Sequence, residues 1–211
     1  MKLLKIKKEN KSRLVIIGSL FIFLISSIYL GFNLLQSDEV KNLNEEQLTE
    51  FFEEYHETKS EEIIDEIHEE VKQEKVEYEK YICVLEIEKI NFKRGFYNKE
   101  SKNNKVNKNI EILKASDYPT KENGNVIIAG HNGNSSVSFF RNLKKLDIGD
   151  IAKIYFENKT YTYKLKSTYE VEKTGTVQIK RNLNKKTLTL ITCKSNSNKQ
   201  LVFIFELDKE E

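Results

Sequence analysis

The sequence contains few of the residues that bind transition metals. Among its 211 residues there are two cysteines and three histidines, and they form neither a Cys-x-x-Cys motif nor a histidine cluster. Structural zinc sites usually hold the ion with four such side chains at short spacings. The sequence therefore predicts neither a transition-metal site nor a cofactor.

A basic surface suited to nucleic acid is also lacking, although the formal net charge is +2. Residues 1–37 hold six basic side chains and one acidic one, residues 38–80 hold five and seventeen, and residues 81–211 hold twenty-four and fifteen. An acidic block thus separates two basic segments, and the lysines of the last segment lie among asparagines rather than around aromatic residues. This distribution predicts no nucleic-acid partner.

Residues 14–35 contain no charged side chain over 22 positions. About 20 apolar residues suffice to cross a bilayer, whereas a cleaved signal peptide has an apolar region of about 7–15 residues. The segment therefore predicts an uncleaved transmembrane helix. All six basic side chains of residues 1–37 lie in residues 1–13. Residues 1–13 are therefore expected in the cytoplasm, and everything after residue 37 is expected outside the plasma membrane.

Residues 36–80 form the acidic block and, from residue 38 onwards, contain no glycine or proline. The apolar residues recur at intervals of three or four and so predict an amphipathic helix: Leu48, Phe52, Tyr55, Ile63, Ile67 and Val71. We interpret it as a stalk that spaces the following domain from the membrane. A coiled-coil dimer and a helix folded back on the domain are the alternatives, and His56 and His68 are interpreted as surface residues.

Residues 81–211 change to short runs of β-branched and aromatic residues, separated by Asn, Gly, Lys and Asp. The expected strands are 81–90, 109–114, 125–130, 151–156, 160–171, 187–193 and 200–207. Only residues 137–146 show helical spacing. Many short strands with one helix favour an all-β, closed or nearly closed barrel.

The stretch FENKTYTYKLKSTYEV is typical of a hairpin, with its turn expected at Asn158 and Lys159. Tyr161, Tyr163 and Leu165 alternate along one face. That face is interpreted as core, and a sugar- or peptide-binding surface is the alternative.

One cysteine and one histidine each follow an apolar strand. NVIIAGH ends at His131, the only histidine after residue 80, and TLTLITC ends at Cys193. A thiol attacks as its thiolate, and a nearby imidazole can lower the thiol pKa and later protonate a leaving amine. Taken alone, however, two residues 62 positions apart could equally be ordinary members of a β domain.

Three segments in order resemble the sortase family: VIIAGHNGNSSVSFFRNLKKLDIGD, TYTYKLKSTYEV and LTLITCKSNSNKQLVFIFEL. Together they cover most of residues 81–211. The resemblance implies an eight-stranded barrel with short helices. It also implies the activity of a cysteine transpeptidase, on the outer side of the plasma membrane. Its substrates would be surface proteins with a Leu-Pro-x-Thr-Gly-like sorting signal, and its acceptor an amine of a cell-wall precursor or a pilin.

The resemblance implies catalytic roles for Cys193 as nucleophile and His131 as its partner. Sortases typically carry an Arg on the strand after the cysteine, but no Arg follows Cys193 here. Lys199 or Gln200 is the expected substitute, although Lys lacks the planar fork of Arg. Thr192 is carried over from the motif as a residue that shapes the oxyanion site.

Several further expectations concern the remaining candidates. Arg141 and Arg181 do not match the family position of the missing Arg. Cys83 is interpreted as a core residue, with a disulfide to Cys193 as the alternative. Some sortases bind calcium, and only isolated acids point to such a site here: Glu111, Asp117 and Glu122.

Two other functions compete with the transpeptidase. Loss of the Arg is compatible with a catalytically impaired, membrane-tethered peptide-binding module. A cysteine peptidase would use water as its acceptor. Among sortase classes, a compact class D-like member is favoured because no long lid precedes the histidine segment.

Overall fold

The computed structural model describes residues 2–61 and 80–211, and the chain divides into two compact units, residues 1–42 and 43–211. Ile63, Ile67, Val71 and His68 lie outside the described residues. The elements are as follows: α1 Lys2–Glu61, β1 Cys83–Ile87, the 3₁₀ helix η2 Glu88–Ile90, β2 Phe92–Phe96, β3 Glu111–Ile112, β4 Asn125–Ala129, the 3₁₀ helix η3 Leu143–Lys145, β5 Ile151–Phe156, β6 Lys159–Glu172, β7 Thr187–Cys193 and β8 Lys199–Glu210.

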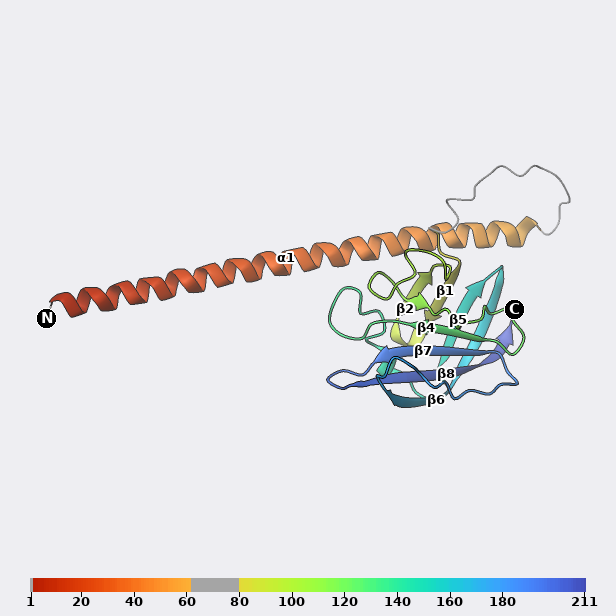
Figure 1. Cartoon of the computed structure of the whole chain (residues 1–211). Helices are drawn as coiled ribbons and strands as arrows, with labels where there is room; N and C mark the ends of the chain where they lie inside the picture. The colour runs from red at the N-terminus through yellow and green to blue at the C-terminus, as the bar shows by residue number, and fades with distance from the viewer. Residues whose placement is uncertain (1, 62–79) are drawn as a thin grey trace. The chain divides into compact units, whose positions relative to one another are not determined.

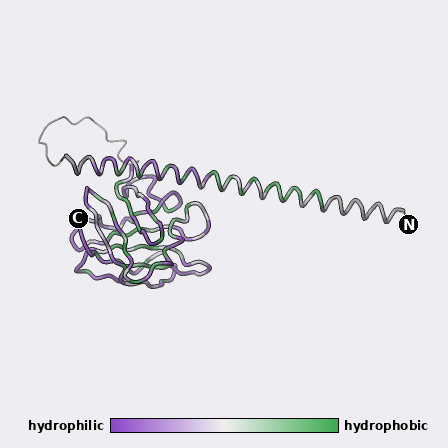
Figure 2. Tube along the Cα trace, turned by 180° about the vertical axis from the view of Figure 1, so that it is seen from behind, coloured by the Kyte–Doolittle hydropathy of each residue, from purple (hydrophilic) through white to green (hydrophobic). Residues whose placement is uncertain are grey.

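The first unit contains the apolar part of α1. Its apolar side chains between Ile16 and Leu35 are exposed, and the most apolar stretch of the helix has a mean hydropathy of 1.9. Figure 2 shows these residues in green along the helix. Helix α1 is therefore long and apolar enough to cross a membrane.

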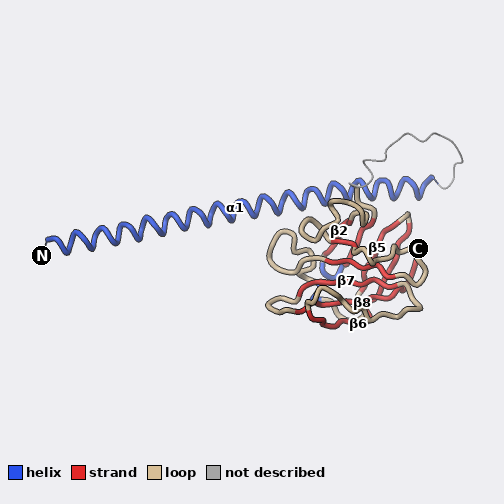
Figure 3. The backbone as a smooth tube through the Cα atoms, viewed as in Figure 1, coloured by secondary structure: helices blue, strands red, loops and turns tan. Residues whose placement is uncertain are grey.

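The second unit is built on one eight-stranded sheet in the order β2-β1-β5-β6-β8-β7-β4-β3 (Figures 1 and 3). Every neighbouring pair is antiparallel except β4 and β7, which run parallel. The sheet curves into a nearly closed barrel, which confirms the expected fold. The parallel pair matters for function because its two strands end at the same edge.

Side chains join the two outer strands of the sheet. Asn109, two residues before β3, donates from Nδ2 to the carbonyl of Gly95 in β2 at 2.8 Å. Its Oδ1 accepts from Nη1 of Arg94 at 3.0 Å. These bonds satisfy backbone and guanidinium groups that unpaired edge strands would leave open.

The barrel interior is filled by alternate residues of the strands. The residues Tyr161, Tyr163 and Leu165 of β6 are fully buried in it, which confirms that the alternating face is core. Burial raises the pKa of Tyr161 to about 12. The tyrosines therefore do not form a binding surface.

Three local expectations were wrong. The β5–β6 turn is formed by Glu157 and Asn158, both at positive φ, because Lys159 already pairs with Phe156. Two positive φ values give a turn whose twist matches the strands.

The second difference is strand β2, which the sequence analysis did not predict because two cations and Gly95 interrupt its apolar pattern. A Cβ on Gly95 would lie 1.9 Å from the ring of Tyr81, so this strand needs a glycine.

The third error is the helix expected at residues 137–146, where the structure has turns and only η3. Ser138 and Arg141 explain the difference. The hydroxyls of Ser135 and Ser138 lie 2.8 Å apart, and Arg141 donates to the carbonyls of both serines at 2.6 and 3.0 Å. Such local bonds compete with helix formation.

The last part of α1 belongs to the second unit and packs on the outer face of β1, β2 and β5. Phe52 and Tyr55 place their rings 5.2 and 6.0 Å from that of Tyr155. Tyr81 and Tyr97 donate to Asn44 and Gln47, at 3.3 and 3.0 Å. These contacts are those of a helix folded back on the domain, which was one of the two alternatives to the stalk.

Candidate active site

The parallel strands β4 and β7 bring the candidate histidine and cysteine to the same edge. Ala129 pairs with Ile191, so two residues further on His131 comes level with Cys193. Gly130 donates its N–H to the carbonyl of Ile191 at 3.1 Å, which continues the pairing past the end of β4. By alternation, His131 and Cys193 lie on the same, outer face of the barrel. Both are half-buried.

The pairing of β7 with β8 separates the two candidates for the missing Arg. Gln200 lies directly opposite Cys193, and their side chains share one face of the sheet. Lys199 points to the other face, where its Nζ lies 3.5 Å from Glu170 and 3.9 Å from Glu172. Gln200, not Lys199, is therefore the neighbour of the cysteine.

Thr192 also lies on the face opposite Cys193 and is buried, with 2% of its surface exposed. Its hydroxyl donates to the carbonyl of Gly130 at 2.7 Å. The hydroxyl therefore ties the end of β7 to the residue before His131 and is turned away from the thiol. This contact supports the site from the interior of the barrel.

The turn after Cys193 is held at both ends. Lys194 donates its backbone N–H to the carbonyl of Lys199 at 2.9 Å, and Glu170 on β6 forms ion pairs with both lysines. The hydrogen bond from the side chain of Lys194 is the largest cause of the lowered pKa of Glu170. The backbone N–H of Lys194 is therefore already engaged within the turn.

Asn132 is a further residue of this site that sequence reasoning missed. Its Nδ2 donates to the carbonyl of Cys193 at 2.8 Å and to the hydroxyl of Ser195 at 3.2 Å. In the sequence it is one of several asparagines in a polar loop. Only its position directly after His131 could have singled it out.

The loop after His131 packs back on the strand end. Phe140 donates its N–H to the carbonyl of His131 at 2.9 Å, and its ring covers Gly130 so closely that a Cβ there would lie 2.7 Å away. Phe140 is 1% exposed. Glycine is therefore required before His131 for this packing.

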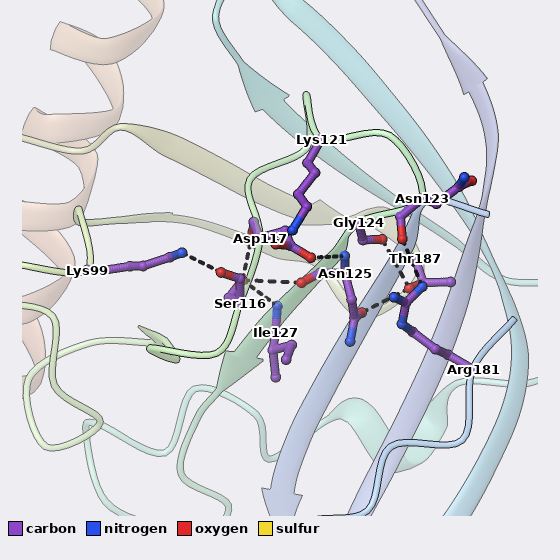
Figure 4. Close-up of polar contacts among 10 residues, drawn as sticks. All are labelled: Lys99, Ser116, Asp117, Lys121, Asn123, Gly124, Asn125, Ile127, Arg181 and Thr187. Atoms are coloured by element: carbon purple, nitrogen blue, oxygen red, sulfur yellow. Dashed lines mark hydrogen bonds and ion pairs between the residues drawn. The ribbon is translucent and has the colours of Figure 1, made fainter. Parts of the chain in front are cut away.

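Polar contacts, some buried and some exposed, fix the opposite ends of β4 and β7 (Figure 4). The Oδ1 of Asn125 accepts from the hydroxyls of Thr187 and Thr189 at 3.0 and 2.9 Å. Arg181 donates to the carbonyl of Asn123 at 3.0 Å, just before β4 begins. Arg181 thus lies at the far end of these strands from Cys193, and it binds the segment between β6 and β7 to the barrel.

The second cysteine takes no part in the site. Cys83 is fully buried in the core, and both cysteines are free thiols, so the disulfide alternative is wrong. Burial raises the pKa of the Cys83 thiol well above its ordinary value. A thiol that is neutral and out of contact with water is a poor nucleophile.

Within residues 2–61 and 80–211, no group of three His, Cys, Asp or Glu side chains is arranged to hold a metal ion. Two of the three acids considered for calcium have other partners. Glu111 accepts from the N–H of Val106 at 3.0 Å, and Asp117 accepts from Lys121 and from the N–H of Asn125 at 2.6 and 3.0 Å. Glu122 is exposed.

Comparisons with known proteins agree with this geometry. A family model described as a sortase domain matches residues 85–207. Among solved structures, a Clostridium perfringens sortase D5 transpeptidase is 26% identical, with a TM-score of 0.57 over 80% of this chain and 98% of that one. Sortase C1 from Streptococcus agalactiae is 25% identical, with a TM-score of 0.52 over 61% and 68%.

A lid mutant of sortase A from Corynebacterium diphtheriae shares the fold, with 21% identity and a TM-score of 0.55 over 61% of this chain and 70% of that one. No curated protein sequence matches this chain.

Proposed function

Because the chain belongs to the sortase family, whose members are generally cysteine transpeptidases, we propose that it cleaves a sorting signal and transfers the protein to an amine. The observation that carries the proposal is the position of His131 and Cys193 at adjoining ends of two parallel strands, on one face of the barrel. The substrate would carry a Leu-Pro-x-Thr-Gly-like signal. The acceptor would be a cell-wall precursor or a pilin.

In the first half of the reaction, the proton of the Cys193 thiol passes to His131. The thiolate then attacks the carbonyl carbon of the signal's Thr and forms a tetrahedral oxyanion. Collapse of this intermediate breaks the Thr–Gly bond, and the imidazolium of His131 donates its proton to the leaving Gly amine. A thioester between the Thr carbonyl and Cys193 remains.

In the second half, the acceptor amine attacks the thioester carbon, and His131 takes the proton that the amine loses. Collapse of the second tetrahedral intermediate breaks the carbon–sulfur bond and restores the Cys193 thiolate. The new bond is an amide between the Thr carbonyl and the acceptor amine. Water in place of the amine would give simple hydrolysis.

The oxyanion would be stabilised by the side-chain N–H of Gln200. Gln200 faces Cys193 across the β7–β8 pair, whereas Lys199 is on the other face in ion pairs with Glu170 and Glu172. Oxyanion holes are often built from neutral amide donors. Thr192 would act indirectly, since its hydroxyl holds Gly130.

The proposed location is the plasma membrane, with α1 as a single-pass anchor. The basic residues before the apolar stretch favour a cytoplasmic N-terminus, so the barrel would lie outside the cell. There it would meet surface proteins and cell-wall amines. The class D-like assignment proposed for this chain is supported by its similarity to the sortase D5 transpeptidase.

The test is a transpeptidation assay on the full-length chain in detergent, with a library of Leu-Pro-x-Thr-Gly peptides and a glycine-based amine. An amine-linked product is expected from the wild type and from the matched control Cys83→Ala, but not from Cys193→Ala or His131→Ala. Gln200→Ala is expected to lower kcat by about 100-fold, as for the loss of one oxyanion donor, and Lys199→Ala by less than about threefold.

The other outcomes would redirect the proposal. The absence of an Arg after Cys193 favours an impaired peptide-binding module as the second candidate function. Peptide binding without any product would support that module. A hydrolysed product without amine adduct would instead identify a peptidase.

A further inference from the structure

Asn132 joins the two loops that carry the candidate catalytic pair. It directly follows His131, and its Nδ2 reaches the carbonyl of Cys193 at 2.8 Å and the hydroxyl of Ser195 at 3.2 Å. A primary amide has two N–H donors, and these two contacts use both. One side chain thus ties positions that lie 61 and 63 residues further along the chain.

These bonds stand where the regular pairing of the two strands has ended. The last contacts of the β4–β7 pair are the N–H of Gly130 to Ile191 and the hydroxyl of Thr192 to Gly130. Past this point, Asn132 supplies the hydrogen bonds that connect the two loops among the residues the structure describes. The spacing between His131 and Cys193 therefore depends on it.

The orientation of the Cys193 carbonyl affects where the thiol of Cys193 lies. Its peptide plane continues into Lys194, whose N–H is fixed by the carbonyl of Lys199 on β8. The plane is thus held from β8 on one side and from Asn132 on the other. Together with the strand pairing of β7 before it, this fixed plane sets the direction of the Cα–Cβ bond, around which the sulfur takes only staggered positions.

We propose that Asn132 is a positioning residue for the reaction, which holds the Cys193 backbone so that its thiol faces His131. This inference rests on the proposed transpeptidase function. It assigns Asn132 no contact with substrate. Its contribution comes from geometry, since a displacement of about 1 Å at reacting atoms can cost as much as 100-fold in rate.

The test uses the full-length chain in detergent with three variants. Asn132→Ala removes both hydrogen bonds, and Asn132→Asp keeps the size but puts a carboxylate beside the carbonyl of Cys193. Asn134→Ala, an exposed asparagine in the same loop, is the matched control. The first readout is the pH profile of Cys193 alkylation by iodoacetamide, mapped by peptide mass spectrometry. The second is kcat and KM for the peptide and amine.

For Asn132→Ala we expect Cys193 to react more slowly with iodoacetamide across the pH profile, because its thiol would no longer be held towards His131. We expect kcat to fall by about tenfold or more with KM changed by less than about twofold. Asn132→Asp should shift both readouts in the same direction. Asn134→Ala should match the wild type in both.

An unchanged alkylation profile and kcat in Asn132→Ala would overturn the proposal. So would a loss of kcat no larger than the loss of folded protein measured by thermal unfolding, since Asn132 would then be merely structural. If the wild type forms no amine product at all, the proposed function fails on its own. The alkylation profiles of the variants would still decide the role of Asn132.

Discussion

Replacement of Gly130 by alanine should destabilise the barrel and disturb His131. A Cβ at this position would lie 2.7 and 2.8 Å from Cδ2 and Cγ of Phe140. Carbon atoms in contact are normally about 3.5–4.0 Å apart, so the ring would have to move by about 0.8 Å or more. Phe140 is 1% exposed and packs within the hydrophobic core, so its ring can move only by displacing other core side chains.

Overpacking of this kind costs about 1–3 kcal/mol, and a central value of about 2 kcal/mol corresponds to about 4–8 °C in Tm for a domain of this size. Thermal unfolding followed by near-ultraviolet circular dichroism of the tyrosines would measure it. Because Phe140 also donates to the carbonyl of His131, kcat should fall as well.

A double-mutant cycle with Phe140→Leu is the control for this reasoning. Leucine lacks the ring that meets the new Cβ, so Gly130→Ala should cost much less in the Phe140→Leu background. The explanation is refuted if Gly130→Ala alone costs less than about 0.5 kcal/mol, or if the two substitutions are additive.

Three further predictions concern the helix, the turn and the core. Tyr55→Ala should lower stability by about 2–3 kcal/mol in thermal unfolding, because the side chain is 7% exposed and packs on Tyr155; a negligible change would mean that the helix is a free stalk. The lowered pKa of Glu170 implies that its ion pairs contribute fully above the ordinary carboxyl pKa and are lost as the pH falls through the lowered value. The small difference in Tm between wild type and Glu170→Gln should therefore shrink and vanish as the pH falls through the lowered pKa, and a difference that grows in acid would contradict this sign. Finally, iodoacetamide at pH 8 should modify Cys193 and spare the buried Cys83 until the chain unfolds, which mass spectrometry can follow; early modification of Cys83 would show that the core opens.

The barrel was largely predictable because local residue patterns indicate most of its strands. Alternation by two placed Tyr161, Tyr163 and Leu165 in the core, and the order of the histidine and cysteine segments indicated the family. The expected helix at residues 137–146 was wrong because local hydrogen bonds determine the structure there. The hydrogen bonds of Ser135, Ser138 and Arg141 replace the expected helix with turns, and spacing alone does not reveal such bonds.

The sequence indicated the chemistry of the candidate site but not its geometry. The sequence singled out His131 and Cys193, yet the choice between Lys199 and Gln200 needed the register of β7 on β8. A shift by one residue would exchange the faces of the two side chains. The hydrogen bond of Asn132 joins distant loops, and such a contact leaves no local signal in the sequence.

The extent of the folded domain also needed the structure. A helix that is acidic on one side fits both a solvated stalk and a packed element, because the pattern records an apolar face without its partner. Here Phe52 and Tyr55 face Tyr155, while Asn44 and Gln47 accept from tyrosines of the barrel segment. A protein that begins at residue 81 would lose this layer, so experiments should keep α1.

The most direct test of the central claim is to trap the thioester. The full-length chain would be incubated with the sorting-signal peptide library in the absence of amine, quenched in acid and mapped by mass spectrometry. The account predicts an acyl group ending in Thr on the peptide that contains Cys193, discharged when the amine is added and absent from His131→Ala. An acyl group on another residue, or amine-linked product formed by Cys193→Ala, would contradict it.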